Sequence, residues 1–250
     1  MYALITGASS GIGREMAIYL SSLGYDLIVV ARRKECLEEL KKICSTKVEV
    51  ISLDLSKEEN CLKLYDKVKN KKIDILINNS GFGLCGDFIE TDLNKELEII
   101  DLNIKCLHIL TKLFLKDMVK NNKGYILNVA SSAAFAPGPL MATYYSTKSY
   151  VLRLTQSIYR ELKQKKSNVV ISALCPGPVD TEFNDVANVK FAFKPLASKY
   201  VAKYAVNKLF KRKHVIIPGT SMKFNRFFSK IVPDKLSSIV IYHSQKKKLK

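Results

Sequence analysis

Short apolar runs alternate along this chain with stretches in which apolar residues recur at helical spacing. The helical pattern covers residues such as 14–23, 34–43 and 93–120. The apolar runs predict seven strands, at residues 2–5, 26–30, 48–53, 74–78, 124–130, 168–175 and 214–219. Strands that alternate with helices favour a parallel sheet. We therefore expect an α/β fold with a doubly wound, seven-stranded parallel sheet and helices on both faces.

The domain organisation follows from the length and from where this pattern ends. A chain of 250 residues that is 47% hydrophobic suits one sizeable domain, which we place at residues 1–219. Residues 220–250 read as a basic, amphipathic C-terminal extension made of helix. Residues 176–195 show no clear periodicity and predict a long loop with a short helix, and loops of that length are often functional.

Composition excludes several classes of protein. No apolar run is long enough for a transmembrane helix, and no basic stretch precedes an apolar segment at the N-terminus, so we expect a cytoplasmic protein. The six cysteines and three histidines are scattered and predict neither a metal site nor a disulfide framework. The net charge is +18, and most of it lies in the last quarter of the chain.

The stretch "TGASSGIG", residues 6–13, directly follows the first predicted strand. Glycine tolerates positive φ and lets a ligand approach the backbone, and the helix that follows offers free N–H groups to a pyrophosphate. The spacing is Gly-x-x-x-Gly-x-Gly, which differs from the common dinucleotide fingerprint. A glycine-rich turn without a ligand is the alternative.

The second predicted strand ends at Arg32 and Arg33, where dinucleotide folds often carry an acid for the ribose hydroxyl. An arginine there accommodates a 2′-phosphate instead, and Arg14 adds positive charge nearby. This favours NADP(H) over NAD(H). The alternative is that both arginines are solvated charges at the start of a helix.

Tyr144 and Lys148 stand four residues apart, so they share a face if this segment is helical. A tyrosine is a poor acid or base near pH 7, but a neighbouring ammonium favours the phenolate and lowers the pKa. Such a pair can exchange a proton with a carbonyl or an alcohol. The spacing alone also occurs by chance, as a surface lysine beside a half-buried tyrosine.

Six motifs in the same order give the chain a wider resemblance. They are "TGASSGIG", "DL" at 54–55, "NNSG" at 78–81, "LN" at 102–103, the Tyr-x-x-x-Lys pair and "CPGPVDT" at 175–181. Together they resemble the short-chain dehydrogenase/reductase family over residues 2–219, with Ser80 at the family's usual alanine. The resemblance is closer to the branch with ketoacyl and hydroxysteroid-type reductases, and it implies a Rossmann-like fold.

The resemblance implies a catalytic tetrad of Asn103, Ser131, Tyr144 and Lys148. Ser131 would hold the substrate oxygen, Tyr144 would be the general acid, and Asn103 would anchor a water that links Lys148 to solvent. Lys148 would lower the pKa of Tyr144 and bind the nicotinamide ribose. Ser132 and Tyr145 are the neighbouring alternatives for the serine and the tyrosine.

The resemblance and the two arginines together imply a set of residues that bind the cofactor. They are Gly7, Ser9, Ser10, Gly11, Ile12, Gly13, Arg32, Arg33, Asp54, Leu55, Asn79, Ser80, Gly81, Tyr144, Lys148, Pro176, Gly177, Val179 and Thr181. Large apolar residues flank this set in the sequence and suggest an apolar substrate pocket, or ordinary core. They are Phe135, Leu140, Met141, Phe183, Phe191 and Phe193.

The C-terminal extension carries an apolar helical stripe among basic residues. Phe224, Phe227, Phe228 and Ile231 have helical spacing, and residues 236–243 repeat it after Pro233. Basic charge beside such a stripe is typical of an interfacial helix on anionic lipid. The alternatives are a cover over the chain's own cleft, a subunit contact in a homodimer or homotetramer, and a solvated tail. No module for nucleic acid is recognisable.

The pattern as a whole predicts an NADP(H)-dependent oxidoreductase that interconverts a carbonyl and a secondary alcohol on an apolar or lipid-like small molecule. The alternative is a protein on the same scaffold that binds a dinucleotide or a membrane surface without turnover. All four positions of the implied tetrad hold the expected residues, which favours the enzyme.

Overall fold

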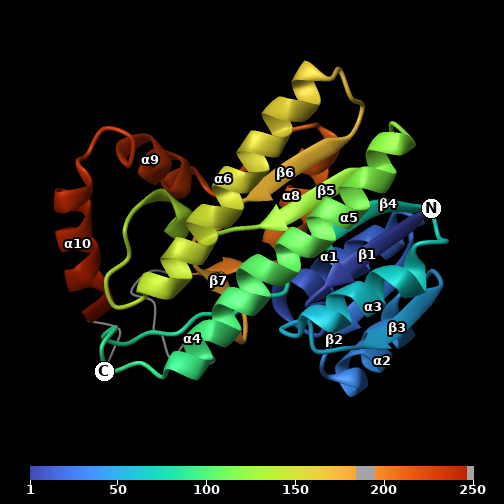
Figure 1. Ribbon diagram of the computed structural model, residues 1–250, viewed down its shortest axis with the longest axis horizontal. Coiled ribbons are helices and arrows are strands. Elements are labelled where there is room, and N and C mark those ends of the chain that lie inside the picture. Colours follow the sequence, from blue (N-terminus) through green and yellow to red (C-terminus); the bar gives the residue numbers. More distant parts are fainter. Residues whose placement is uncertain (184–194, 247–250) are drawn as a thin grey trace.

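A parallel β-sheet of seven strands forms the centre of the computed structural model, which describes residues 1–183 and 195–246 (Figure 1). The strand order is β3-β2-β1-β4-β5-β6-β9, and all neighbouring strands run parallel. This order, which grows outward in both directions from β1, confirms the predicted doubly wound sheet. The strands are β1 Tyr2–Thr6, β2 Asp26–Ala31, β3 Val48–Ser52, β4 Ile73–Asn78, β5 Tyr125–Val129, β6 Val170–Leu174 and β9 Val215–Ile216.

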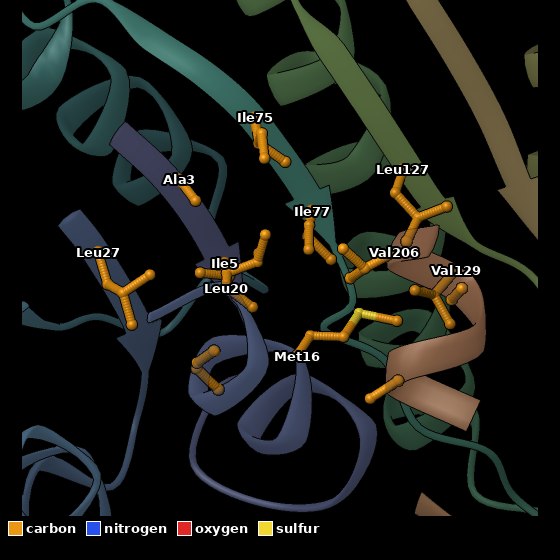
Figure 2. Packing of buried hydrophobic residues seen from close by; sticks show 14 of the residues in the cluster. Ala3, Ile5, Met16, Leu20, Leu27, Ile75, Ile77, Leu127, Val129 and Val206 are labelled. Atoms are coloured by element: carbon orange, nitrogen blue, oxygen red, sulfur yellow. The ribbon is translucent and has the colours of Figure 1, made fainter. Parts of the chain in front are cut away.

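The strands are apolar on both faces because helices cover both sides of the sheet. All six residues of β4 are buried, and so are four of the five residues of β1. Ala3 and Ile5 pack on one side with Met16 and Leu20 of helix α1 (Figure 2). The helices on that side are α1 Gly11–Ser22, α2 Lys34–Ile43 and α8 Ser198–Phe210.

The other face of the sheet carries the second hydrophobic layer. Leu4, between Ala3 and Ile5 in β1, packs there with Leu64 and Phe114. The alternation within β1 therefore splits the core into two layers, as expected for a buried strand. The helices of this layer are α3 Glu58–Val68, α5 Leu107–Lys120 and α6 Ala142–Gln164.

The predicted helix over residues 93–120 contains an irregularity that its sequence pattern does not show. It begins as α4 Leu93–Ile100, passes through the π-helical turn Asp101–Cys106, and continues as α5. Such single turns insert an extra residue and occur frequently at functional sites. The turn carries Asn103, whose side chain is buried.

A hydrogen-bonded cluster of polar side chains lies in the apolar layer between β4 and β5. Asn78 and Asn128 are direct neighbours in the sheet, and Asn78 Nδ2 donates to Asn128 Oδ1 at 2.9 Å. Asn78 Nδ2 also donates to Thr111 Oγ1 at 3.0 Å, and Asn128 Nδ2 donates to Thr155 Oγ1 at 3.0 Å. The cluster therefore ties two strands to helices α5 and α6.

The predicted loop 176–195 contains structure that the pattern did not indicate. A short parallel pair, β7 Val179–Asp180 and β8 Leu196–Ala197, brings its two ends together. Residues 184–194, which include the predicted pocket residues Phe191 and Phe193, lie outside the described part of the chain.

The C-terminal extension is helical, as predicted, and forms α9 Thr220–Phe228 and α10 Asp234–Lys246. Both helices lie beyond α6, at the end of the molecule opposite α2 and β3 (Figure 1). No helix within residues 1–183 and 195–246 combines the length and the apolar character needed to cross a bilayer.

Candidate active site

A cleft of about 590 Å³ lies where the loops after β1, β2, β4, β5 and β6 meet. Its volume is within the usual range for small-molecule and cofactor sites. In open α/β sheets, ligands bind at the carboxyl ends of the strands, where the order of the strands reverses. Every residue of the predicted tetrad and of the predicted cofactor set lines this cleft except Gly13 and Asn103.

The glycine-rich corner needs glycine at particular positions. Gly7 and Gly11 have φ of +65° and +55°, in the left-handed region that favours glycine. A Cβ at Gly13 would overlap the carbonyl oxygen of Gly7 and the side chain of Asn79, so Gly13 acts by packing behind the corner. Helix α1 begins at Gly11 beside the cleft, and Ser10 at its N-cap makes no side-chain capping bond. The free N–H groups and this hydroxyl fit a pyrophosphate group.

Asn79, the residue directly after β4, supports the same corner. Its Nδ2 donates to the carbonyl oxygens of Thr6, at 3.1 Å, and Gly7, at 3.0 Å. The hydroxyl of Thr6 in turn accepts the backbone N–H of Asn79 at 3.0 Å and of Ser80 at 3.1 Å. These bonds hold the glycine corner and the loop after β4 in one fixed arrangement.

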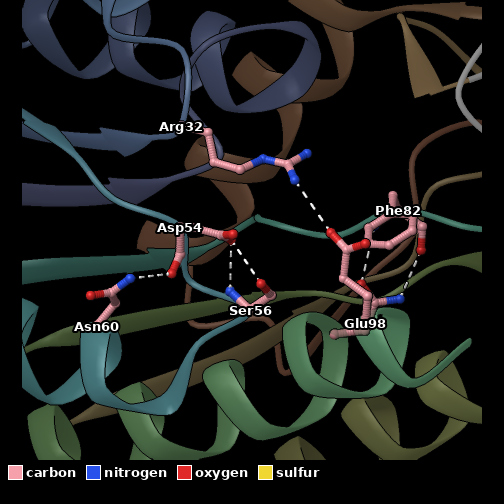
Figure 3. Close-up of polar contacts among 7 residues, drawn as sticks. Arg32, Asp54, Ser56, Asn60, Phe82 and Glu98 are labelled. Carbon is pink, nitrogen blue, oxygen red and sulfur yellow. Dashed lines mark hydrogen bonds and ion pairs between the residues drawn. The ribbon is translucent and has the colours of Figure 1, made fainter. Parts of the chain in front are cut away.

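The two predicted arginines line the cleft, and each pairs with an acid. Arg32 Nη1 lies 3.3 Å from Glu98 Oε1 (Figure 3). Arg33 Nη2 lies 2.7 Å from Glu182 Oε2 and donates to Ser9 Oγ at 3.2 Å. The hydrogen bond to Glu182 raises the pKa of Arg33, and Arg33 lowers the pKa of Glu182. Both arginines are therefore held beside the cleft by ion pairs.

Asp54 and Leu55, in the loop after β3, form another part of the same wall. The carboxylate of Asp54 accepts the N–H of Ser56 at 3.1 Å and its hydroxyl at 2.8 Å (Figure 3). Asn60 Nδ2 donates to the Asp54 carbonyl oxygen at 2.9 Å. The loop is thus fixed by its own polar groups.

Tyr144 and Lys148 lie one turn apart on α6, and both are buried at the wall of the cleft. Lys148 Nζ lies 5.8 Å from the centre of the Tyr144 ring and donates to the Val129 carbonyl oxygen at 3.0 Å. The spacing therefore places the phenol and the amine together, as the sequence predicted.

Burial dominates the protonation of this pair, because a desolvated site disfavours the charged form of each group. It raises the pKa of Tyr144 to about 12, although a hydrogen bond with Ser131 acts in the opposite direction. It lowers the pKa of Lys148 to about 8. The predicted lowering of the Tyr144 pKa is therefore wrong for this site, because burial raises the pKa instead.

The neighbouring alternatives occupy different positions. The Ser131 hydroxyl interacts with the Tyr144 phenol and accepts the backbone N–H of Ala133 at 3.1 Å. Ser132 also lines the cleft. Tyr145 lines it too, but its hydroxyl accepts a hydrogen bond from Gln245 Nε2 at 2.8 Å. The contact between Ser131 and Tyr144 favours this pair as the candidate catalytic residues.

Asn103 lies behind the wall rather than in the cleft. Its Nδ2 donates to the Phe82 carbonyl oxygen at 3.0 Å and to Thr147 Oγ1 at 3.1 Å, and its Oδ1 accepts the Phe82 N–H at 3.1 Å. A Cβ on Gly81 would lie 2.7 Å from Asn103 Oδ1 and 3.3 Å from Lys148 Nζ. Asn103 therefore joins the loop after β4 to α6 next to Lys148, and the water relay stays a prediction.

The rest of the cleft includes residues that the sequence analysis missed. Met141 and Phe183 line it as predicted, whereas Phe135 and Leu140 do not. Several further lining residues, such as Phe82 after β4 and three on the C-terminal helices, carry no recognisable motif. Those three are Met222, Asn225 and Gln245.

Helix α9 faces the cleft with residues that are not part of the apolar stripe. Phe224, Phe227 and Phe228 are exposed, whereas Met222 and Asn225 of the same helix line the cleft. The interpretation that the apolar stripe covers the chain's own cleft is therefore wrong, because other residues of the same helix line the cleft.

Comparison with known proteins gives a match over most of the chain. A family model described as short chain dehydrogenase matches residues 1–190. An uncharacterised oxidoreductase of Staphylococcus epidermidis is 32% identical over 88% of this chain and 96% of that protein. A very-long-chain 3-oxoacyl-CoA reductase of Danio rerio is 30% identical over 74% of this chain and 61% of that protein.

Solved structures resemble most of the chain. A short-chain dehydrogenase from Sphingobium yanoikuyae, in complex with NADPH, has a TM-score of 0.83 and 28% identity, covering 95% of each chain. A short-chain dehydrogenase/reductase from Burkholderia phymatum, in complex with NAD, has a TM-score of 0.82 and 24% identity, covering 90% of this chain and 91% of that one. The second likeness shows the shared fold alone.

Proposed function

The chain belongs to the short-chain dehydrogenase family, and from this premise we propose that it is an NADP(H)-dependent oxidoreductase interconverting a carbonyl and a secondary alcohol. The observation that carries the proposal is the buried pair of Tyr144 and Lys148, with the partly buried Ser131 in contact with the phenol, at the wall of the cleft that begins at the glycine corner. A nicotinamide bound there supplies the hydride.

Tyr144 is the proposed proton donor. Its raised pKa keeps the phenol protonated near pH 7, which suits donation to a carbonyl oxygen during reduction. The Ser131 hydroxyl, in contact with the phenol, would hold the same oxygen. Lys148 would bind the nicotinamide ribose, and Asn103 would help to position Lys148 through its hydrogen bond to the preceding residue, Thr147.

The preference for NADP(H) rests on charge. Arg32 and Arg33 follow β2 and line the cleft, and no acid stands at those two positions. A guanidinium binds a phosphate well because its planar donors match the phosphate oxygens. Each arginine would exchange its present partner, Glu98 or Glu182, for the 2′-phosphate.

The proposed substrate is an apolar or lipid-like small molecule. Met141 and Phe183 pack in one apolar cluster with Tyr144, and Met222 lines the same cleft. Such a wall binds an apolar body and leaves the phenol at the polar end. The name of the Danio rerio relative agrees with a substrate of this class.

We also propose a homo-oligomer for the protein in solution. Leu93, Leu97 and Ile100 are exposed along one face of α4, at helical spacing. An apolar face of this kind is typical of subunit contacts. Size-exclusion chromatography with light scattering would measure the mass, and a purely monomeric protein would contradict this proposal.

Replacement of Tyr144 with phenylalanine tests the catalytic proposal. Loss of the proton donor should lower turnover by about 10²–10⁴-fold, because general acid catalysis contributes that much. NADPH affinity should change little, since the ring remains. Oxidation of NADPH is followed by absorbance with a panel of ketones, aldehydes and acyl carbonyls.

Tyr145→Phe is the matched control, because Tyr145 also lines the cleft but its hydroxyl is bound to Gln245. It should lower turnover far less than Tyr144→Phe, and full activity of Tyr144→Phe would refute the assignment. Parallel titrations with NADPH and NADH test the cofactor preference. Tight NADPH binding without turnover on the whole panel would instead favour a dinucleotide-binding protein without catalysis.

A further inference from the structure

The outer face of helix α9 is an apolar surface that no described part of the chain covers. Phe224, Phe227, Phe228 and Ile231 are each between 57% and 65% exposed. They stand at helical spacing, so they project from one side of α9 and the turn that follows it. Large aromatic side chains clustered in water are unusual on a protein without a partner at that surface.

Helix α10 continues this surface. Leu236, Ile239 and Val240 are between 49% and 69% exposed. Figure 1 shows α10 beside α9 at the edge of the molecule, after the turn at Pro233. We call the seven residues of the two helices together the outer apolar face.

The opposite sides of both helices are fixed against the domain. Gln245 Nε2 donates to the Tyr145 hydroxyl at 2.8 Å, and the Arg226 guanidinium lies 4.8 Å from the centre of the Phe135 ring. Met222 and Asn225 line the cleft. A rotation that buried the outer apolar face would break these contacts, so the face remains directed outward.

Basic side chains surround this face. Lys223, Lys230, Lys235 and Lys246 lie on or beside the two helices, and none of them forms an ion pair within the described residues. Asp234 is the single acid of residues 220–250. Positive charge around an apolar stripe is the pattern of helices that lie in the interface of an anionic bilayer.

The same charge disfavours a second copy of the chain as the occupant. A symmetric dimer through this face would bring two equally basic surfaces together, and like charges across an interface are unfavourable. In an anionic bilayer, the phenylalanines can insert at the boundary of the acyl chains while the lysines interact with the headgroup phosphates. We propose that the outer apolar face of α9 and α10 binds the surface of an anionic membrane.

Membrane binding through α9 and α10 would also affect how a substrate reaches the cleft. Met222, Asn225 and Gln245 place the inner sides of α9 and α10 in the wall of the cleft. The cleft would therefore lie next to the bilayer, and a carbonyl compound dissolved in lipid could enter it without crossing water. This consequence rests on the proposed function, whereas the membrane contact does not.

Sedimentation of the full-length protein with vesicles tests the contact. We expect binding to vesicles of phosphatidylcholine and phosphatidylserine in equal parts, and weak binding to phosphatidylcholine alone. Phe224→Ser, Phe227→Ser and Phe228→Ser together should reduce partitioning by at least ~100-fold, because each buried phenylalanine contributes strongly. The matched control replaces three exposed apolar residues at or near helices α1, α2 and α3 with serine, namely Leu23, Ile43 and Leu62, and should bind like the wild type.

A second variant tests the charge. Lys223→Gln with Lys230→Gln should weaken binding by about 5-fold for each lysine at low salt. The matched control, Lys112→Gln with Lys116→Gln on α5, should have little effect, because α5 packs on the sheet away from α9 and α10. NADPH affinity, measured in parallel, shows that each variant keeps its fold.

Three results would overturn the proposal: equal binding of the wild type to both vesicle types, no binding to either, or full binding by the triple serine variant. If the serine variant instead lowered the mass of an oligomer and the wild type ignored vesicles, the face would be a subunit contact. Absence of turnover would refute the proposed function and leave vesicle binding unchanged.

Discussion

Replacement of Lys148 with methionine is expected to make the cofactor-free protein more stable near pH 7, although it removes a candidate catalytic group. Lys148 is 4% exposed, and its amine donates a hydrogen bond to the Val129 carbonyl oxygen. An ammonium held there has lost most of its hydration, and one neutral hydrogen bond does not replace it. Methionine has a similar length and carries no charge.

The magnitude follows from the pKa of Lys148, which burial lowers from 10.5 to about 8. A change of that size corresponds to ~3 kcal/mol, because each pKa unit is 1.36 kcal/mol. Between pH 8 and 10.5 the unfolded chain binds a proton that the folded protein does not, so stability rises with pH in this window. The penalty is complete below pH 8 and falls to ~1 kcal/mol at pH 9.5.

The variant also loses the hydrogen bond to Val129, which costs about 1 kcal/mol at every pH. The net gain from Lys148→Met is therefore ~2 kcal/mol at pH 7 and close to zero at pH 9.5. Tyr144 is present in both proteins, so its own titration cancels from the comparison.

Urea unfolding at pH 7 and pH 9.5, without nucleotide, measures both differences in the free energy of unfolding. Lys112→Met on the exposed side of α5 is the control and should show no dependence on pH. A Lys148→Met variant that is less stable than the wild type at pH 7, or equally shifted at both pH values, would refute the reasoning.

Two further substitutions test other parts of the site. Glu182→Gln frees Arg33 from a half-exposed ion pair worth ~0.2–1 kcal/mol, so NADPH should bind up to ~5-fold tighter at low salt while NADH is unaffected. Fluorescence titration measures both, Glu98→Gln makes the same comparison for Arg32, and an equal change for the two nucleotides would argue against a 2′-phosphate contact. Gly13→Ala places a Cβ against a backbone carbonyl and should lower the free energy of unfolding by ~1–3 kcal/mol, whereas an unchanged urea midpoint would contradict the packing role.

The sheet and the corner of the cleft could be predicted from the sequence because their signals are local. Each strand is a short apolar run, and the glycines of residues 6–13 must follow the first of them to turn the chain. Tyr144 and Lys148 were predictable as neighbours because a single helix sets the distance between them. The family resemblance supplied Ser131, which no spacing rule indicates.

The remaining features depend on contacts between distant parts of the chain. Arg33 and Glu182 are far apart in the sequence, so their ion pair was not foreseeable. The π-helical turn at Asn103 was not predicted, because residues 93–120 read in the sequence as one amphipathic helical segment. The direction of Phe224 is set by what the opposite side of α9 touches, which periodicity alone does not reveal.

The amide cluster between β4 and β5 helps to fix the pairing register of these two strands. A shift of one residue between these strands would move Asn78 away from Asn128. Both amide side chains would then lose this hydrogen bond among buried leucines and isoleucines. Apolar strands such as these offer little discrimination among their alternative alignments. The two asparagines therefore favour the observed alignment of β4 and β5 over alignments shifted by one residue.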